Sequence, residues 1–168
     1  MPKIRQGTSQ INFKNSASIG RVFTPVASGP PVNLITNPSF TTNTTGWSSN
    51  GGTSRNTTNY KSAPASLYQT FDDGYSAFVE YSGVGVLTVG QVYSLSIWIK
   101  GSPLQVTLTC GGNQVSITPP TTADFTNYKI ENVSCTSNGN LQVVVGSGDT
   151  NFYIDDVSVV LGPTALVL

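Results

Sequence analysis

The chain has 168 residues, of which 10% are charged, with eight basic residues, eight acidic residues and no histidine. This length is enough for one domain with a real core, and without histidine the usual general base, triad partner and metal ligand are missing. No apolar run approaches the roughly 18–20 residues that cross a membrane. Composition therefore argues against an enzyme and against a membrane protein, and its short apolar runs between Gly, Ser, Thr, Asn and Pro favour an all-β fold.

The first 31 residues differ from the rest in charge. They contain four of the eight basic residues, and the first acidic residue of the chain is Asp72. They also contain isolated apolar residues that a purely solvating tail does not need. We interpret residues 1–31 as an arm that docks on a negatively charged partner, with a solvated tail as the alternative. The residues expected to make this contact are Lys3, Ile4, Arg5, Ile11, Phe13, Lys14, Arg21 and Phe23. Because these charges are sparse and the body is acidic, nucleic-acid binding is not expected.

The predicted domain covers residues 32–163. Its polar stretch 41–59 is expected to wrap the surface and to be pinned there by Trp47. Alternating runs then predict strands over 65–71, 76–81, 91–100, 104–110, 114–118, 127–135, 141–145 and 152–161. This regular spacing predicts an all-β, antiparallel jelly-roll β-sandwich that carries the N-terminal arm. Residues 164–168 form an apolar tail that packs on the domain or on a partner.

The run 91–100 is the clearest strand in the sequence. One face carries Tyr93, Leu95, Ile97 and Ile99, and the other carries Ser94, Ser96, Trp98 and Lys100. The apolar face belongs in a core. Trp98 stands alone as a large ring on the polar face, so it is either a platform for a ligand or a side chain covered by a loop.

The first residues lack the apolar segment of a secretory signal peptide. The chain is therefore expected to be made and used without export, in the cytoplasm of the cell that makes it. In that environment Cys110 and Cys135 are predicted to be reduced, buried thiols rather than a disulfide.

Four stretches, taken in order, resemble landmarks of family 4/9-type carbohydrate-binding modules. Residues 33–40 (Asn-Leu-Ile-Thr-Asn-Pro-Ser-Phe) resemble the family opening, and Gly46-Trp47 stands where the family has Gly-Trp. Residues 90–100 look like its Tyr-x-Leu-Ser-x-Trp-x-Lys strand, and residues 152–159 (Phe-Tyr-Ile-Asp-Asp-Val-Ser-Val) look like its closing strand. The resemblance spans residues 33–161 and implies a jelly-roll fold. With its short arm, the chain looks most like the versions carried by bacteriophage virion proteins.

The same resemblance raises the question of a structural calcium, the one cofactor considered. The family opening often continues with a glutamate that helps to bind this ion, whereas Thr41 stands here. The closing aspartates associated with the ion are present as Asp155 and Asp156. Because calcium usually takes two or more carboxylates, the change at Thr41 argues against it. The alternative is that one aspartate caps a turn and the other faces water.

Sugar binding is the functional option that the domain itself suggests. Pyranose rings stack on aromatic side chains, while amides and carboxylates take their hydroxyls. The candidate contacts are Trp98, Tyr153, Tyr81 and Tyr75, each with the alternative that it packs under a loop or at a subunit contact.

Two hypotheses follow from these patterns. The first is a non-enzymatic bacteriophage virion protein, a capsid decoration or cement protein whose arm binds the major capsid protein or another virion protein, in homo-oligomers such as trimers. The second is a stand-alone carbohydrate-binding module or tail-associated adhesin that binds host-surface glycans.

Overall fold

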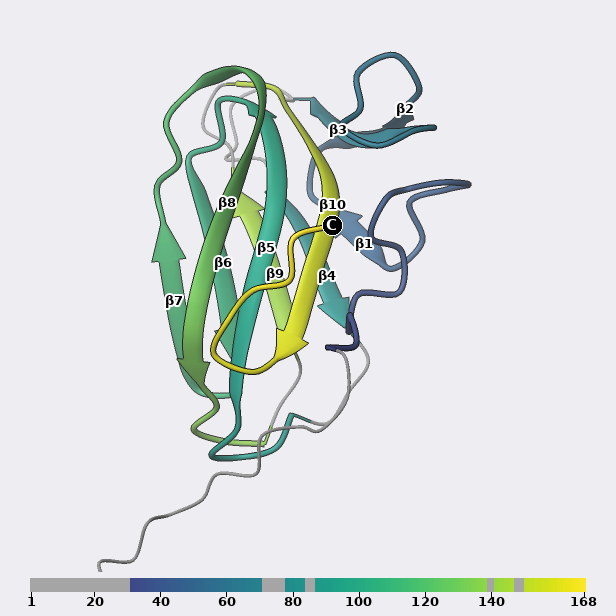
Figure 1. Cartoon of the computed structure of the whole chain (residues 1–168). Helices are drawn as coiled ribbons and strands as arrows, with labels where there is room; N and C mark the ends of the chain where they lie inside the picture. The colour runs from purple at the N-terminus through teal and green to yellow at the C-terminus, as the bar shows by residue number, and fades with distance from the viewer. Residues whose placement is uncertain (1–30, 71–77, 84–86, 139–140, 147–149) are drawn as a thin grey trace, which may run out of the picture.

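The computed structural model describes residues 31–70, 78–83, 87–138, 141–146 and 150–168. These residues form two five-stranded antiparallel sheets packed face to face (Figure 1). In spatial order the first sheet holds β1 (Trp47–Ser49), β4 (Phe78–Gly83), β9 (Leu141–Gly146), β6 (Gln105–Cys110) and β7 (Asn113–Ile117). The second holds β2 (Gly52–Asn56), β3 (Ser66–Thr70), β10 (Phe152–Leu161), β5 (Val92–Gly101) and β8 (Thr122–Ser134). The predicted all-β antiparallel sandwich is confirmed. Within these residues no helix is long and apolar enough to cross a membrane.

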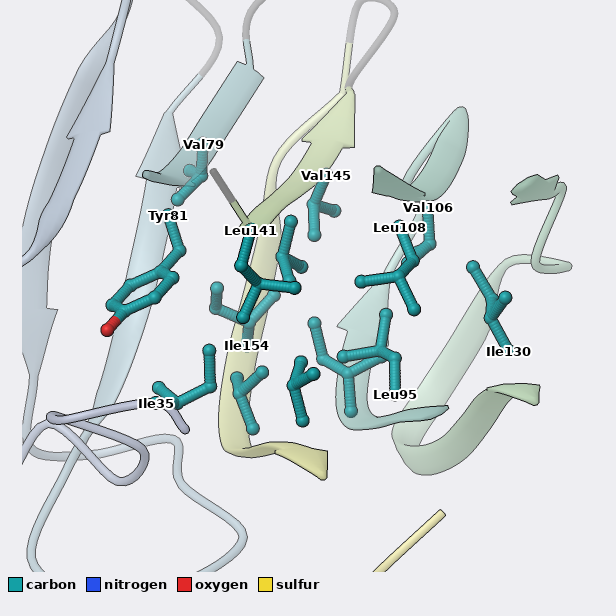
Figure 2. Close-up of a cluster of buried hydrophobic side chains, with 14 of the residues drawn as sticks. Ile35, Val79, Tyr81, Leu95, Val106, Leu108, Ile130, Leu141, Val145 and Ile154 are labelled. Carbon is teal, nitrogen blue, oxygen red and sulfur yellow. The ribbon is translucent and has the colours of Figure 1, made fainter. Parts of the chain in front are cut away.

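The core lies between the two sheets (Figure 2). On β5 the side chains of Leu95, Ile97 and Ile99 are fully buried, as their alternation predicted. They face Val106 and Leu108 of the first sheet among others, because both sheets turn every second residue inward. Function is therefore left to the outer faces, the edges and the loops.

The polar stretch 41–59 is more regular than predicted, because it contains the strands β1 and β2. Trp47 does pin it to the domain. Its ring centre lies 5.5 Å from that of Phe40 and 5.3 Å from that of Tyr81, in tilted contacts. The strands predicted over 65–71 and 76–81 do not pair with each other as a hairpin, because β3 and β4 belong to different sheets.

The C-terminal segment packs on its own domain. The Gly162 N–H donates to the Val92 carbonyl at 2.7 Å, and the Ala165 N–H donates to Glu131 Oε1 at 3.0 Å. The segment runs back over β5 (Figure 1). At this end of the sheet, side chains that point away from the core are nevertheless fully buried, namely Ser94, Ser96, Ser158 and Val160.

The residues predicted to form the docking arm lie outside the described residues. The division of the chain at residues 31 and 163 therefore stays a prediction.

The two cysteines lie next to each other between the sheets. Cys110 ends β6 and Cys135 follows β8, and both thiols are free and buried. The loops that carry them pack tightly, since a Cβ at Gly111 would clash with the Ser137 carbonyl. Burial, together with the hydrogen bond to Cys135, raises the pKa of Cys110 to about 12.

We expect these thiols to resist alkylation in the native protein. The thiolate is the reactive form, and a rise from the usual pKa of 9.0 to about 12 lowers its fraction at Cys110 on the order of a thousandfold. Iodoacetamide labelling followed by mass spectrometry should show both thiols unmodified at pH 8 and modified in urea. Rapid labelling of the native protein would contradict the described packing.

Candidate functional site

A row of four side chains crosses the outer face of the second sheet. Ser54 on β2 pairs with Tyr68 on β3, Tyr68 pairs with Tyr153 on β10, and Tyr153 pairs with Lys100 on β5. We call these four residues the tyrosine row. Directly opposite residues on neighbouring strands place their side chains in contact on one face. The C-terminal segment contacts Val92 and Ser94 at the start of β5, whereas Lys100 stands near the end of that strand. The row therefore lies at the opposite end of the sheet from the C-terminal segment.

The two tyrosines of the row are stacked. Their ring centres are 4.6 Å apart and their planes differ by 23°. Both side chains are half-buried. Burial is the larger cause that raises the pKa of Tyr153, and the neighbouring Tyr68 is the smaller one. On the far side of Tyr68 stands the exposed, small Ser54. The Tyr68 ring is therefore bordered by a large partner on one side and a small one on the other.

Polar groups border the other side of the row. The Lys100 ammonium lies 5.9 Å from the centre of the Tyr153 ring and donates to Asn59 Oδ1 at 2.9 Å. The Asn59 amide also reaches the Tyr153 hydroxyl at 3.5 Å. Aromatic surface, an amide and an ammonium group thus meet within one small area.

Asp155 holds the segment that supplies these polar groups. Its Oδ2 accepts the backbone N–H groups of Lys61 and Ser62 at 2.8 and 2.9 Å, and its Oδ1 accepts the Asp156 N–H at 2.8 Å. Desolvation nevertheless raises the pKa of Asp155 to about 6 from 3.8. The buried carboxylate thereby fixes the backbone of Lys61 and Ser62, which follow Asn59 in the chain, on the outer face of the sheet.

Trp98 lies beneath this segment. It pairs with Asp155 across β5 and β10, and its ring is half-buried. The Lys61 ammonium stands 4.6 Å from the ring centre. The buried indole Nε1 finds no acceptor among the described residues. Lys61 therefore lies over a half-buried ring, and the choice between a ligand platform and a side chain covered by a loop stays open for Trp98.

Asp156 sits in a bulge of β10 that breaks the register with β5 between Asp155 and Ser158. Its φ of 44° is left-handed, which turns the carboxylate toward Ser39 and Ser62. Ser39 Oγ donates to Oδ1 at 2.9 Å, and the Ser62 hydroxyl donates to Oδ2. Both aspartates are buried, so the expectation that one of them faces water is wrong.

These contacts bear on the calcium that the resemblance raised. Asp155 Oδ2 accepts two backbone N–H groups and Oδ1 accepts one, so few lone pairs of this carboxylate are left for a metal. Asp156 offers one carboxylate beside two hydroxyl groups. In the described part of the chain no group of three or more His, Cys, Asp or Glu residues gathers at one point. The prediction that no structural calcium binds stays untested, with Asp155 and Asp156 as the residues that would hold the ion.

The remaining predicted sugar contacts lie elsewhere. Tyr81 is 1% exposed, and its hydroxyl is engaged by the Thr36 N–H and by the Leu34 carbonyl. A ring buried to that degree has no surface on which a sugar can stack. Tyr75 lies outside the described residues.

Sequence reasoning missed Tyr68, Asn59 and Lys61. Tyr68 stands in a predicted strand, and alternation with the inward Leu67 places it on the outer face. Its stacking on Tyr153 depends on strand order, which a pattern along one strand does not give. Lys61 is held at the site by Asp155, a long-range contact with no local signal, whereas Asn59 is held by a local turn in which its N–H donates to Asn56 Oδ1 at 2.7 Å.

The outer face of the first sheet has a different character. One row there runs through Ser48, Glu80, Val144, Thr107 and Ser116. Among the described residues of its strands, Phe78 is the one aromatic side chain on that face. The second sheet therefore carries the larger aromatic surface.

No model of a known protein family matches the sequence, and no curated protein matches it. Solved structures do match. The family 61 carbohydrate-binding module solved with β-1,4-galactotriose has a TM-score of 0.63 and 20% identity, covering 78% of this chain and 99% of its own. The CBM22-1 xylan-binding domain of Paenibacillus barcinonensis Xyn10C has a TM-score of 0.61 and 16% identity, covering 83% and 100%.

A third match is tailspike protein 4 of bacteriophage CBA120, with a TM-score of 0.64 and 13% identity. It covers 77% of this chain but 21% of the tailspike. At such identities the likeness concerns the fold alone. The chain has the jelly-roll β-sandwich fold of carbohydrate-binding modules, whereas membership of family 4/9 and the virion form stay predictions.

We expect Asp155→Asn to destabilise the domain by about 1–3 kcal/mol, the cost of an unsatisfied buried donor. Whichever way the amide turns, its NH₂ meets at least one of the three N–H groups that the carboxylate accepts. Urea unfolding measures the difference, which equal stability of the two proteins would contradict.

The stability difference between wild type and Asp155→Asn should also depend on pH. The folded-state pKa of Asp155, about 6, lies above the usual 3.8, so the folded state holds the proton more tightly. Its contribution to stability therefore grows as the pH falls from about 6 to about 4. The gap between wild type and Asp155→Asn should widen over that range.

Proposed function

We propose that the protein is a carbohydrate-binding module that binds its saccharide at the tyrosine row. The observation that carries this proposal is the stacked Tyr68–Tyr153 pair on an outer sheet face, with amide and ammonium groups beside it. Apolar faces of pyranose rings stack on such rings, and polar neighbours orient the hydroxyls.

The geometry suggests how the saccharide lies. One face of Tyr153 meets Tyr68 and its other side meets Lys100, so stacking room is left mainly over Tyr68 beside Ser54. A ring stacked there continues along the row toward Asn59 and Lys100. The bound chain thus crosses the strands rather than running along one of them.

Binding without catalysis is part of the same proposal. Two of the matched structures are a carbohydrate-binding module in complex with β-1,4-galactotriose and a xylan-binding domain. The carboxylate of Asp155, two residues after Tyr153 on β10, is buried and engaged by backbone N–H groups. It serves to position the segment 59–62 rather than to attack a glycosidic bond.

We expect Tyr153→Ala and Tyr68→Ala each to weaken saccharide binding about tenfold, from lost stacking and burial. A glycan array identifies ligands, and isothermal titration with the best of them gives the affinities. Tyr81→Phe is the control, because it alters a buried ring and should cost stability without affecting binding. Unchanged affinity in both row variants would refute the proposed surface.

A virion role for residues 1–31 is a second proposal, in which the arm binds a capsid or other virion protein and the domain is displayed outward. It is supported by the concentration of basic and apolar residues in that segment. The match to a bacteriophage tailspike adds that this fold occurs in at least one phage protein. Homo-oligomers such as trimers belong to this proposal.

Deleting residues 1–31 should abolish association with the particle and leave saccharide binding intact, because the two activities lie in different parts of the chain. Co-sedimentation of the full chain and of residues 32–168 with capsids of the encoding phage tests this. Equal co-sedimentation of both would exclude the arm as the anchor.

A further inference from the structure

We propose that the saccharide bound at the tyrosine row is anionic, bearing carboxylate or sulfate groups that lie against Lys61 and Lys100. This inference rests on the proposed function and names its ligand class. It is argued from the position, the partners and the surroundings of the two ammonium groups.

Both ammonium groups lie on the outer face at the row. Lys100 follows Trp98 by two residues on β5, so their side chains leave the same face about 7 Å apart. The Lys61 ammonium stands 4.6 Å from the centre of the Trp98 ring, and the Lys100 ammonium stands 5.9 Å from the centre of the Tyr153 ring. Two positive charges thus flank the aromatic surface.

The contacts of these cations are to neutral groups. Lys61 meets an indole ring, and Lys100 meets a phenol ring and the Asn59 amide oxygen. Such contacts orient an ammonium group without cancelling its charge. An ammonium has three N–H donors. One of those of Lys100 donates to Asn59, so the other donors remain for a ligand.

Among the described residues, three of the four carboxylates of this face are engaged elsewhere. The Asp155 oxygens accept backbone N–H groups, the Asp156 oxygens accept serine hydroxyls, and Glu131 accepts the Ala165 N–H. Asp124 is exposed on the bulged part of β8 opposite Lys100. Of these four it is the one positioned to oppose an incoming anion, so Asp124→Asn should strengthen binding.

The lysines are also held in place, which favours discrimination. The Lys61 backbone is fixed by its N–H on buried Asp155 and its ammonium lies 4.6 Å from the centre of the Trp98 ring, while the Lys100 ammonium is fixed by Asn59. A carboxylate or sulfate adds Coulomb attraction to the hydrogen bond that it accepts from an ammonium group. A neutral hydroxyl accepts the hydrogen bond without that attraction, so the difference favours the anionic ligand.

The test uses matched polysaccharides that differ in charge alone. The pairs are polygalacturonate with its full methyl ester, and dextran sulfate with dextran. Affinity electrophoresis and titration are run with the full chain, with Lys100→Gln and Lys61→Gln, and with Lys129→Gln as the matched control. Lys129 is exposed on the same face but pairs with Ser96, four residues or about 13 Å along β5 from Lys100.

We expect at least one charged polymer to bind about tenfold or more tightly than its neutral partner, with this preference falling as salt rises. Lys100→Gln and Lys61→Gln should each reduce affinity for the charged form about tenfold, whereas Lys129→Gln should change it less than about twofold.

Two failures are distinguishable. Binding of charged and neutral forms alike, still weakened by Tyr153→Ala, would leave the proposed function standing and overturn the anionic ligand. Binding of no saccharide, in these pairs or on the array, would overturn both. An effect of Lys129→Gln equal to that of Lys100→Gln would show non-specific charge attraction and also reject the inference.

Discussion

The burial of alternate residues between two sheets is the constraint on which the rest of this molecule depends. Leu95, Ile97 and Ile99 of β5 are sealed against the first sheet, so the residues between them must face outward whatever their character. That geometry places Trp98 and Lys100 on the outer face, and the pairing of β5 with β10 places Tyr153 beside Lys100. The candidate surface is therefore a consequence of core packing, and its rigidity is that of the sheet.

A second layer of structure decides how much of that face remains accessible. At one end the C-terminal segment lies over β5, tied down by Gly162 and Ala165. At the other end the segment 59–62 is bound to buried Asp155. Placing a carboxylate there is costly, as its raised pKa reflects, and three backbone N–H bonds offset that cost. The result is an ordered segment that carries Asn59 and Lys61 to the edge of the tyrosine row.

Much of the fold could be predicted from the sequence, because the alternation of apolar and polar residues along a strand indicates which side chains are buried. The inward faces of β5 and β10 and the pinning role of Trp47 follow from local pattern. The strands β1 and β2 were missed because they are short and polar. The site was only half predicted, since Tyr153 belongs to an alternating strand, whereas its contact with Tyr68 depends on strand order. Tyr81 alternates as clearly as Tyr153 but faces inward, a distinction that composition along β4 does not make.

The central claim is that the outer face of the second sheet, rather than that of the first, receives the saccharide. Chemical-shift mapping of the ¹⁵N-labelled full chain, titrated with the saccharide that binds best, tests it most directly. The account predicts the largest amide shifts at the tyrosine row, on Ser54, Tyr68, Tyr153 and Lys100. Shifts concentrated instead on Ser48, Glu80, Val144 and Ser116 of the first sheet would contradict it.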